Sequence, residues 1–172
     1  DADGTIGGAV YSTPDVISAA LRVIGTAHGT KLLSSFFFII FENRDDLPSQ
    51  INVFSDCGLV IDPNAQELAD IAIAAAGSMS DLIGLEPKIA MLSFSTWGSA
   101  KHLNVDKVVE ATALVKKMRP DLRIEGELQF DAAMIPSVAA DKAPGSNVAG
   151  QANIFVFPNL DAGNIGYKIA QR

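Results

Sequence analysis

Cysteine is nearly absent from this sequence, since Cys57 is the only one among 172 residues. A single cysteine excludes a disulfide within the chain and fits a reducing compartment, so we expect a cytoplasmic protein. Histidine is scarce too: His28 and His102 lie far apart in the sequence, and neither belongs to a pattern typical of a metal site. Cys57 has no histidine near it in sequence that would activate it as a nucleophile. A buried, inert thiol is therefore the favoured interpretation.

Long apolar runs and basic clusters are also missing. The longest apolar stretch, 32–41, is interrupted by Ser34 and Ser35 and falls short of the roughly 20 residues that a membrane helix needs. Thirteen Lys and Arg against twenty Asp and Glu give a net charge of −7, without the basic face that a nucleic-acid partner requires. These absences argue against membrane and nucleic-acid partners. The 48% of hydrophobic residues provides a sizeable core and favours additional burial in an oligomer.

Alternating apolar runs and helix caps predict an α/β fold with three αβα layers and a largely parallel sheet. Strands are expected at 33–41, 51–54 continued by 59–61, 88–94, 123–128 and 154–157. Helices are expected from Ser12–Pro14 to a stop at Gly29, at 65–82, at 104–118 with Asn104 as the cap, from 131 with a bend at Pro136, and from 165 onward. The glycines at 4–8 lack the spacing and the preceding strand of a dinucleotide fingerprint, which excludes a generic NAD-binding domain.

The segment 154–172 is the most informative for function. An apolar run ends at Pro158, a polar loop carries Asn159, Gly163 and Asn164, and a helix is expected to begin near Ile165. Such a junction directs free backbone N–H groups to the carboxyl edge of a sheet, where anionic ligands bind. Tyr167 and Lys168 follow on the first predicted turn. Lys168 can reach a phosphate there, although a solvated lysine is the ordinary alternative.

Other polar clusters have both a functional and an ordinary interpretation. Ser12 and Thr13 at a helix start can bind phosphate, or can simply cap the helix. The serine and threonine hydroxyls of 93–96 can line a cleft at a strand end, or belong to a loop that prefers small polar residues. Trp97, on the same loop, can contact a ligand or a partner, or pack internally.

Acidic residues gather at another predicted strand end. Glu125 and Glu127 should share one face of the strand, and Asp131 follows at the start of the next helix. Paired carboxylates can perform acid–base chemistry, but such acids more often cap a helix.

Several strings, in order, resemble the phosphate acetyl/butyryltransferase family. They are Ala2–Gly4, Ser12–Thr13, Asp56–Cys57, Glu86–Ser93, Gly126–Ala133, Lys142–Pro144 and Phe157–Arg172. The resemblance implies transfer of an acetyl group between coenzyme A and inorganic phosphate by direct thiolate attack on acetyl phosphate, with neither a metal nor a bound prosthetic group. It also implies an isopropylmalate-dehydrogenase-like architecture of two α/β domains, with the active site between them, and a homodimer formed mainly through the second domain. The apolar helix segment 71–76 is a candidate part of that dimer interface.

On this resemblance, residues 1–27 are a remnant of the first domain with a crossing helix, and 28–172 are most of the second domain. Asp1 is not an initiator Met and Arg172 falls within a predicted helix, so we expect a fragment, inactive by itself. The family's Pro-Val-Asn-Asp-Leu-Ser-Arg-Gly segment, which carries the catalytic aspartate, is not in this sequence, so no catalytic residue is assigned. The residues expected to bind substrate or CoA are Ser12, Thr13, Asn159, Gly163, Asn164, Tyr167 and Lys168.

One departure from the family leaves a second function open. Ser18 stands where the family has an arginine that holds phosphate, and Arg22 lies one helical turn later. A serine cannot replace a preorganised charged donor, whose loss costs ~10²–10³ in rate. The alternative is therefore a non-catalytic, acetyl-CoA-sensing regulatory domain of the kind fused to malic enzymes. The length of the whole protein is the discriminator expected between the two.

Overall fold

The fold was analysed in a computed structural model that describes residues 4–26, 30, 32–42 and 50–172. The chain divides into two compact units, Asp1–Leu33 and Ser34–Arg172. In the first, helix α1 (Thr13–Val23) begins after Ser12, whose hydroxyl oxygen accepts a hydrogen bond from the Asp15 N–H, as the sequence predicts. None of its residues is buried. The helix ends at Val23, and the expected stop at Gly29 lies outside the described residues.

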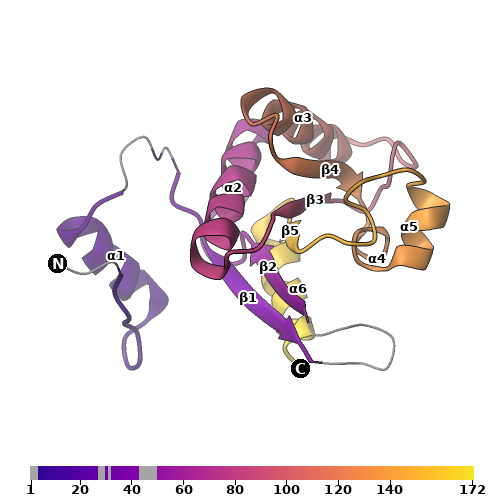
Figure 1. Cartoon of the computed structure of the whole chain (residues 1–172). Coiled ribbons are helices and arrows are strands. Elements are labelled where there is room, and N and C mark those ends of the chain that lie inside the picture. Colours follow the sequence, from indigo (N-terminus) through magenta and orange to yellow (C-terminus); the bar gives the residue numbers. More distant parts are fainter. Residues whose placement is uncertain (1–3, 27–29, 31, 43–49) are drawn as a thin grey trace. The chain divides into compact units, whose positions relative to one another are not determined.

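The second unit is built on a five-stranded sheet in the order β1-β2-β5-β3-β4 (Figure 1). The strands are β1 (Phe36–Phe41), β2 (Gln50–Ser55), β3 (Lys88–Leu92), β4 (Arg123–Leu128) and β5 (Ile154–Val156). Strand β1 pairs antiparallel with β2, and every other pairing is parallel. The prediction of a largely parallel sheet is thereby confirmed.

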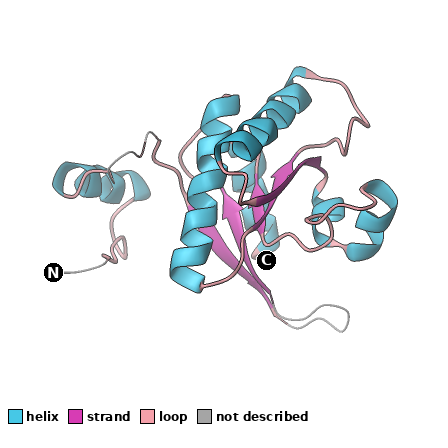
Figure 2. Ribbon diagram, turned by 45° about the horizontal axis from the view of Figure 1, so that its top comes forward, coloured by secondary structure: helices cyan, strands magenta, loops and turns pink. Residues whose placement is uncertain are grey.

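Helices cover both faces of the sheet (Figure 2), which confirms the three-layer α/β prediction. One face carries α2 (Ala65–Ser78), extended by a π-helical turn at Met79–Ile83, and α3 (Leu103–Met118). The other carries α4 (Phe130–Met134), α5 (Pro136–Lys142) and α6 (Leu160–Ala170). The bend expected at Pro136 separates α4 from α5.

Helix α2 explains the apolar run noted in the sequence. Asn64 and Glu67 form a capping box at its start, and the helix packs against both the sheet and α3. Leu68, Ala69, Ile71, Ala72, Ala75 and Ala76 are buried within this chain. Most of the run thus has an internal partner, while Ala74 is exposed and Ile73 half-buried. A role for this segment in a dimer stays a prediction.

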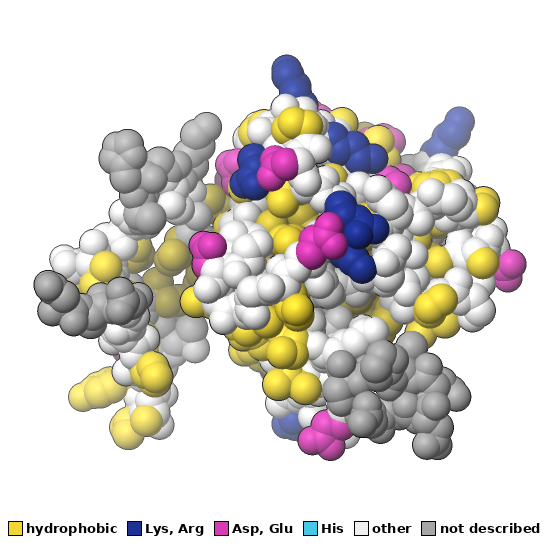
Figure 3. Space-filling view, viewed as in Figure 1, with side chains coloured by type: hydrophobic (Ala, Val, Ile, Leu, Met, Phe, Trp, Pro, Cys, Tyr) yellow, Lys and Arg dark blue, Asp and Glu magenta, His cyan; other side chains and the backbone are white. Residues whose placement is uncertain are grey.

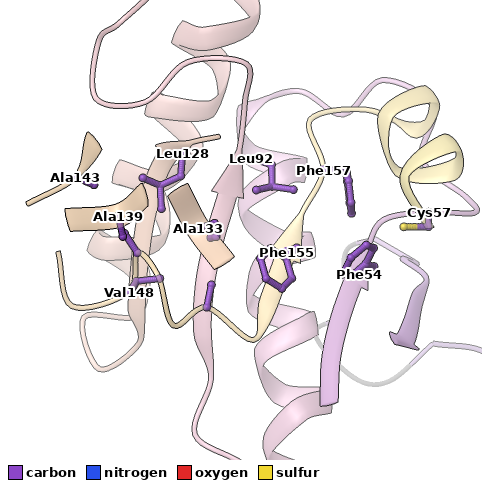
Figure 4. Close-up of a cluster of buried hydrophobic side chains, with 13 residues drawn as sticks. Phe54, Cys57, Leu92, Leu128, Ala133, Ala139, Ala143, Val148, Phe155 and Phe157 are labelled. Atoms are coloured by element: carbon purple, nitrogen blue, oxygen red, sulfur yellow. The ribbon is translucent and has the colours of Figure 1, made fainter. Parts of the chain in front are cut away.

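Aromatic and small side chains form the core on the opposite face (Figure 4). Phe54 of β2 lies at its centre, with ring centroids 5.4 Å from Phe155 and 5.3 Å from Phe157. Leu92 and Leu128, at the ends of β3 and β4, extend this cluster toward α4 and α5. The core therefore reaches the carboxyl ends of the parallel strands.

Three local predictions were wrong. Residues 59–61 form no strand, because the Asp56 carboxylate accepts hydrogen bonds from the backbone N–H groups of 58–60 and folds them into a turn. Helix α3 is capped by His102 and not by Asn104: the His102 side chain accepts from the Asn104 N–H. Helix α6 begins at Leu160, five residues before Ile165, because Asn159 caps it. Three strands are shorter than expected, since β1 begins at Phe36, β3 ends at Leu92 and β5 ends at Val156.

Candidate functional site

A crevice opens where β3 and β5 end. The two strands are parallel neighbours, but β3 continues into α3 on one face of the sheet and β5 into α6 on the other. Connections that diverge in this way leave a crevice at the carboxyl edge, the usual place for a ligand in a parallel α/β sheet. Here it has a volume of about 330 Å³. Its walls are Leu92, Ser93, Phe94, Asn104, Lys107, Phe130, Phe157, Pro158, Asn159 and Ala162.

Polar groups enter this crevice from three elements. Ser93 follows β3, Asn159 precedes α6, and Asn104 and Lys107 share one face of the first turns of α3. Lys107 is the only charged residue in the lining. Its ammonium is already paired with Asp62, at 2.8 Å between Nζ and Oδ1.

The expected free N–H groups at the start of α6 are largely occupied. The Leu160 N–H donates to the Ile61 carbonyl, Ala162 donates to the Asn159 side chain, and Gly163 donates to the Asn159 carbonyl. Because the Asn159 cap and the Ile61 carbonyl, which follows β2, use these donors, the junction does not offer the open anion cradle that the sequence pattern indicates.

The predicted site residues of α6 are divided between two places. Asn159 lines the crevice. Gly163 and Asn164 instead lie against the turn after β2: Asn164 Nδ2 donates to the Cys57 carbonyl at 3.1 Å, and Gly163 faces the Asp56 carbonyl. The face of α6 that carries Gly163 and Asn164 therefore packs against the turn after β2.

Tyr167 and Lys168 lie further along α6. The Tyr167 ring stacks on Phe37 of β1 at 4.3 Å between centroids. Lys168 is in the last turn, not the first as expected, and its ammonium donates to Asn164 Oδ1 and lies 4.9 Å from the Tyr167 ring centroid. Ser12 and Thr13 belong to the first unit, whereas the crevice lies in the second. Binding roles for all of these residues remain predictions.

The loop after β3 is held by two residues at the end of β4. Glu127 is buried, and its Oε1 accepts from Ser95 Oγ at 2.8 Å and from the Gly98 N–H at 2.6 Å. Gln129 donates its backbone N–H to Thr96 Oγ1 and its side-chain amide to the Phe94 carbonyl. These bonds fix the loop that carries Ser93 and Phe94 along the crevice.

The acidic cluster therefore does not form a catalytic pair. Glu125 is half-buried and pairs with Lys116 at 3.2 Å, whereas Glu127 faces the loop after β3. A register shift between β3 and β4 falls between these positions and breaks the simple alternation. Asp131 pairs with Lys142 at 2.8 Å, and the hydrogen bond from that ammonium lowers the pKa of the Asp131 carboxyl.

Cys57 is expected to resist thiol reagents in the folded protein. The side chain is fully buried, and burial, followed by the charge of Asp56, raises the pKa of its thiol to about 12. At neutral pH the thiolate that would react is almost absent. A disulfide reagent such as Ellman's should label the native protein at least ~100-fold more slowly than the unfolded protein, because the thiolate fraction falls tenfold per pKa unit. Stoichiometric labelling of the native protein within seconds would contradict this.

On the face shown in Figure 3, several basic side chains lie beside acidic ones. Within the part of the chain that the structure describes, no helix is both long and apolar enough to cross a membrane. No group of three or more His, Cys, Asp or Glu side chains is placed to hold a metal ion in that part either.

Asn104 and Lys107 were not among the predicted site residues, although both line the crevice. A usable signal existed, because residues three apart in the first turns of a helix that follows a parallel strand face the carboxyl edge together. Phe130 and Phe157 were also missed, since aromatic residues near strand ends are ordinary core residues.

Comparison with known proteins gives a consistent result. The family model for phosphate acetyl/butaryl transferase matches residues 1–172. The chain is 51% identical over 172 residues to the phosphate acetyltransferase of Acetivibrio thermocellus, covering all of this chain and 52% of the relative. It is 47% identical over 172 residues to the Escherichia coli phosphate acetyltransferase, of which it covers 23%. Among solved structures, a phosphotransacetylase from Streptococcus pyogenes superposes with a TM-score of 0.85 at 53% identity, covering 96% of this chain and 49% of that one.

The chain thus spans about half the length of several of these relatives, and less of others. The family model nevertheless matches it from the first residue to the last. This chain belongs to the phosphate acetyl/butaryl transferase family.

Proposed function

We propose that the protein containing this chain transfers an acetyl group between coenzyme A and inorganic phosphate. The observation that supports this most strongly is identity of about half over the whole chain to proteins named phosphate acetyltransferase. In the proposed reaction the CoA thiol gives its proton to the aspartate that the family carries outside this sequence, and its sulfur forms a bond to the carbonyl carbon of acetyl phosphate. The bond from that carbon to the phosphate oxygen breaks, and phosphate leaves.

The proposal requires neither a metal nor a bound prosthetic group, because acetyl phosphate is already an activated acyl donor. In the second unit, Asn159 and the α6 residues serve as binding and positioning groups. Ser12 and Thr13 serve as binding groups of the first unit. The 172 residues alone are expected to be inactive, and the working protein to be a cytoplasmic homodimer.

Ser18 supports the regulatory alternative, since it lies half-buried in α1 in the position of the family arginine. Protein length does not separate the two functions, because the Escherichia coli relative, of which this chain covers 23%, is also named phosphate acetyltransferase. An activity measurement is therefore needed.

We expect the full-length protein to form acetyl-CoA from acetyl phosphate and CoA without added metal. A Ser18→Arg variant should be at least as active, since an arginine adds a charged donor worth ~1.5–3 kcal/mol per hydrogen bond if it reaches phosphate. Activity in the variant alone would mean that the phosphate site has been lost in the natural sequence. No activity in either protein, together with tight acetyl-CoA binding, would favour the regulatory domain.

A further inference from the structure

We propose that Asp62 sets the charge of the crevice at the ends of β3 and β5. Asp62 is a positioning residue here: it acts through Lys107, offsets the charge of that ammonium, and so weakens the attraction of the crevice for the phosphate group of a substrate. The inference rests on the proposed function, whose two substrates, acetyl phosphate and CoA, both carry phosphate groups. It comes from the ion pair that joins the two residues.

Lys107 brings a single positive charge to the wall of the crevice. Among the described residues it is the only charged one in the lining, and its side chain is just 18% exposed. The other polar side chains of the lining, those of Ser93, Asn104 and Asn159, are neutral. A cation with little water around it attracts an anion more strongly than a solvated one, because water screens charge. Without a partner, Lys107 would therefore draw a phosphate group into the crevice.

Asp62 offsets this charge although it does not line the crevice itself. Its Oδ1 lies 2.8 Å from Lys107 Nζ, and its side chain is 78% exposed. Two opposite charges in contact act on a third charge as a dipole, whose field falls off faster with distance than that of a lone cation. An exposed pair contributes little to folding, so the effect expected from Asp62 is on the charge of the crevice and not on stability.

The backbone holds Asp62 within reach of Lys107. Asp62 ends the turn after β2, in which the Asp56 carboxylate accepts hydrogen bonds from three backbone N–H groups. The carbonyl of the preceding residue, Ile61, accepts from the Leu160 N–H at the start of α6. The turn is thus bonded to α6 on one side of the crevice and, through the ion pair, to α3 on the other. This arrangement favours a placed carboxylate over a chance surface contact.

Kinetics of Asp62→Asn in the full-length protein test the proposal. Asparagine keeps the size of the side chain and an acceptor for the Lys107 ammonium, and it removes the charge. The variant should lower KM for a phosphate-bearing substrate about twofold to fivefold, the range for one exposed charge interaction. The difference should disappear in about 1 M salt, where the Debye length is about 3 Å. A lower KM for acetyl phosphate would place the phosphate of the acyl donor at the crevice, and a lower KM for CoA would place a CoA phosphate there.

Three further variants show whether the carboxylate acts through Lys107. Asp62→Glu restores the charge and should keep both KM values of the unmodified protein. In a Lys107→Met background, Asp62→Asn should lower neither KM, because the cation that it would uncover is gone. Asp121→Asn removes the carboxylate of a different surface pair, with Arg119, and is the matched control that should change neither KM.

Unchanged or raised KM values for both substrates in Asp62→Asn would overturn the proposal, as would a lower KM that persists without Lys107. If the unmodified protein proves inactive, which would refute the proposed function, calorimetric titration of the same proteins with CoA and with inorganic phosphate still decides. Tighter binding of either ligand by Asp62→Asn would support the charge offset. Equal binding, or no binding by any of the proteins, would overturn it.

Discussion

Gly163→Ala is expected to destabilise the protein by ~3 kcal/mol or more, the upper part of the range for overpacking a core. A Cβ atom added at Gly163 would lie 2.3 Å from the Asp56 carbonyl oxygen and 3.2 Å from Cys57 Sγ. Backbone at this distance cannot rotate away as a flexible side chain can. Helix α6 would have to move off the turn after β2, breaking the hydrogen bond from Asn164 to the Cys57 carbonyl.

Gly77→Ala is the matched control. Gly77 lies in α2, and a Cβ atom added there meets nothing within 4 Å. Alanine is ~0.5–1 kcal/mol more favourable than glycine inside a helix, so this variant should be slightly stabilised. Urea unfolding followed by circular dichroism measures both free energies of unfolding. Equal stability of the two variants would contradict the close packing of α6 on the Asp56–Cys57 turn.

Glu127→Ala is expected to have the next largest effect, a loss of ~1–3 kcal/mol of folding stability. The change removes the acceptor of two hydrogen bonds in the loop after β3, from Ser95 Oγ and from the Gly98 N–H. Ser95 is buried, and a buried donor left without a partner costs ~1–3 kcal/mol, whereas Gly98 is exposed and its N–H loses less. Trp97 occupies the left-handed region at a φ of 46° between these two donors, so the loop depends on this anchor to hold its conformation.

Two variants distinguish the loss of the hydrogen-bond acceptor at Glu127 from the loss of its charge and from nonspecific destabilisation. Glu127→Gln keeps a side-chain oxygen that can accept the same bonds, and it should recover most of the stability. Glu125→Ala removes a carboxylate two positions away that pairs with Lys116, and a partly exposed pair of this kind contributes only ~0–1 kcal/mol. Trp97 is the only tryptophan, so its fluorescence reports the loop directly. An unchanged Trp97 spectrum and unfolding midpoint in Glu127→Ala would refute the anchoring role.

The fold was accessible from the sequence because its signals are local. The β3 and β5 runs are largely apolar and short, and the Asn64–Glu67 box marks the start of α2 without any tertiary information. Alternation of such elements is enough to predict a parallel α/β sheet. The failure at 59–61 came from a local contact that the apolar pattern does not show, because the Asp56 carboxylate accepts hydrogen bonds from the backbone N–H groups of 58–60. The start of α6 is set by the Asn159 cap and by the distant Ile61 carbonyl, which accepts from the Leu160 N–H.

The candidate site was predicted only in part, for a related reason. The pattern placed Asn159 at a carboxyl edge, and the structure puts it in the lining of the crevice. It could not reveal that Lys107 is paired with Asp62, 45 positions away, or that β3 and β5 are neighbours. Taken alone, the segment 154–172 indicates a general anion site. The ion pair of Lys107 and the pairing of β3 with β5 together reveal that the lining of the crevice is largely neutral.

Arsenate-dependent breakdown of acetyl-CoA by the full-length protein is the most direct test of the central proposal. Arsenate replaces phosphate as the acetyl acceptor, and the acetyl arsenate that forms hydrolyses, so release of free CoA thiol records each transfer. We predict steady CoA release that requires both arsenate and protein and that phosphate inhibits competitively. Binding of acetyl-CoA without any arsenate-dependent release of CoA would contradict the transferase and identify the chain as a sensor of its ligand.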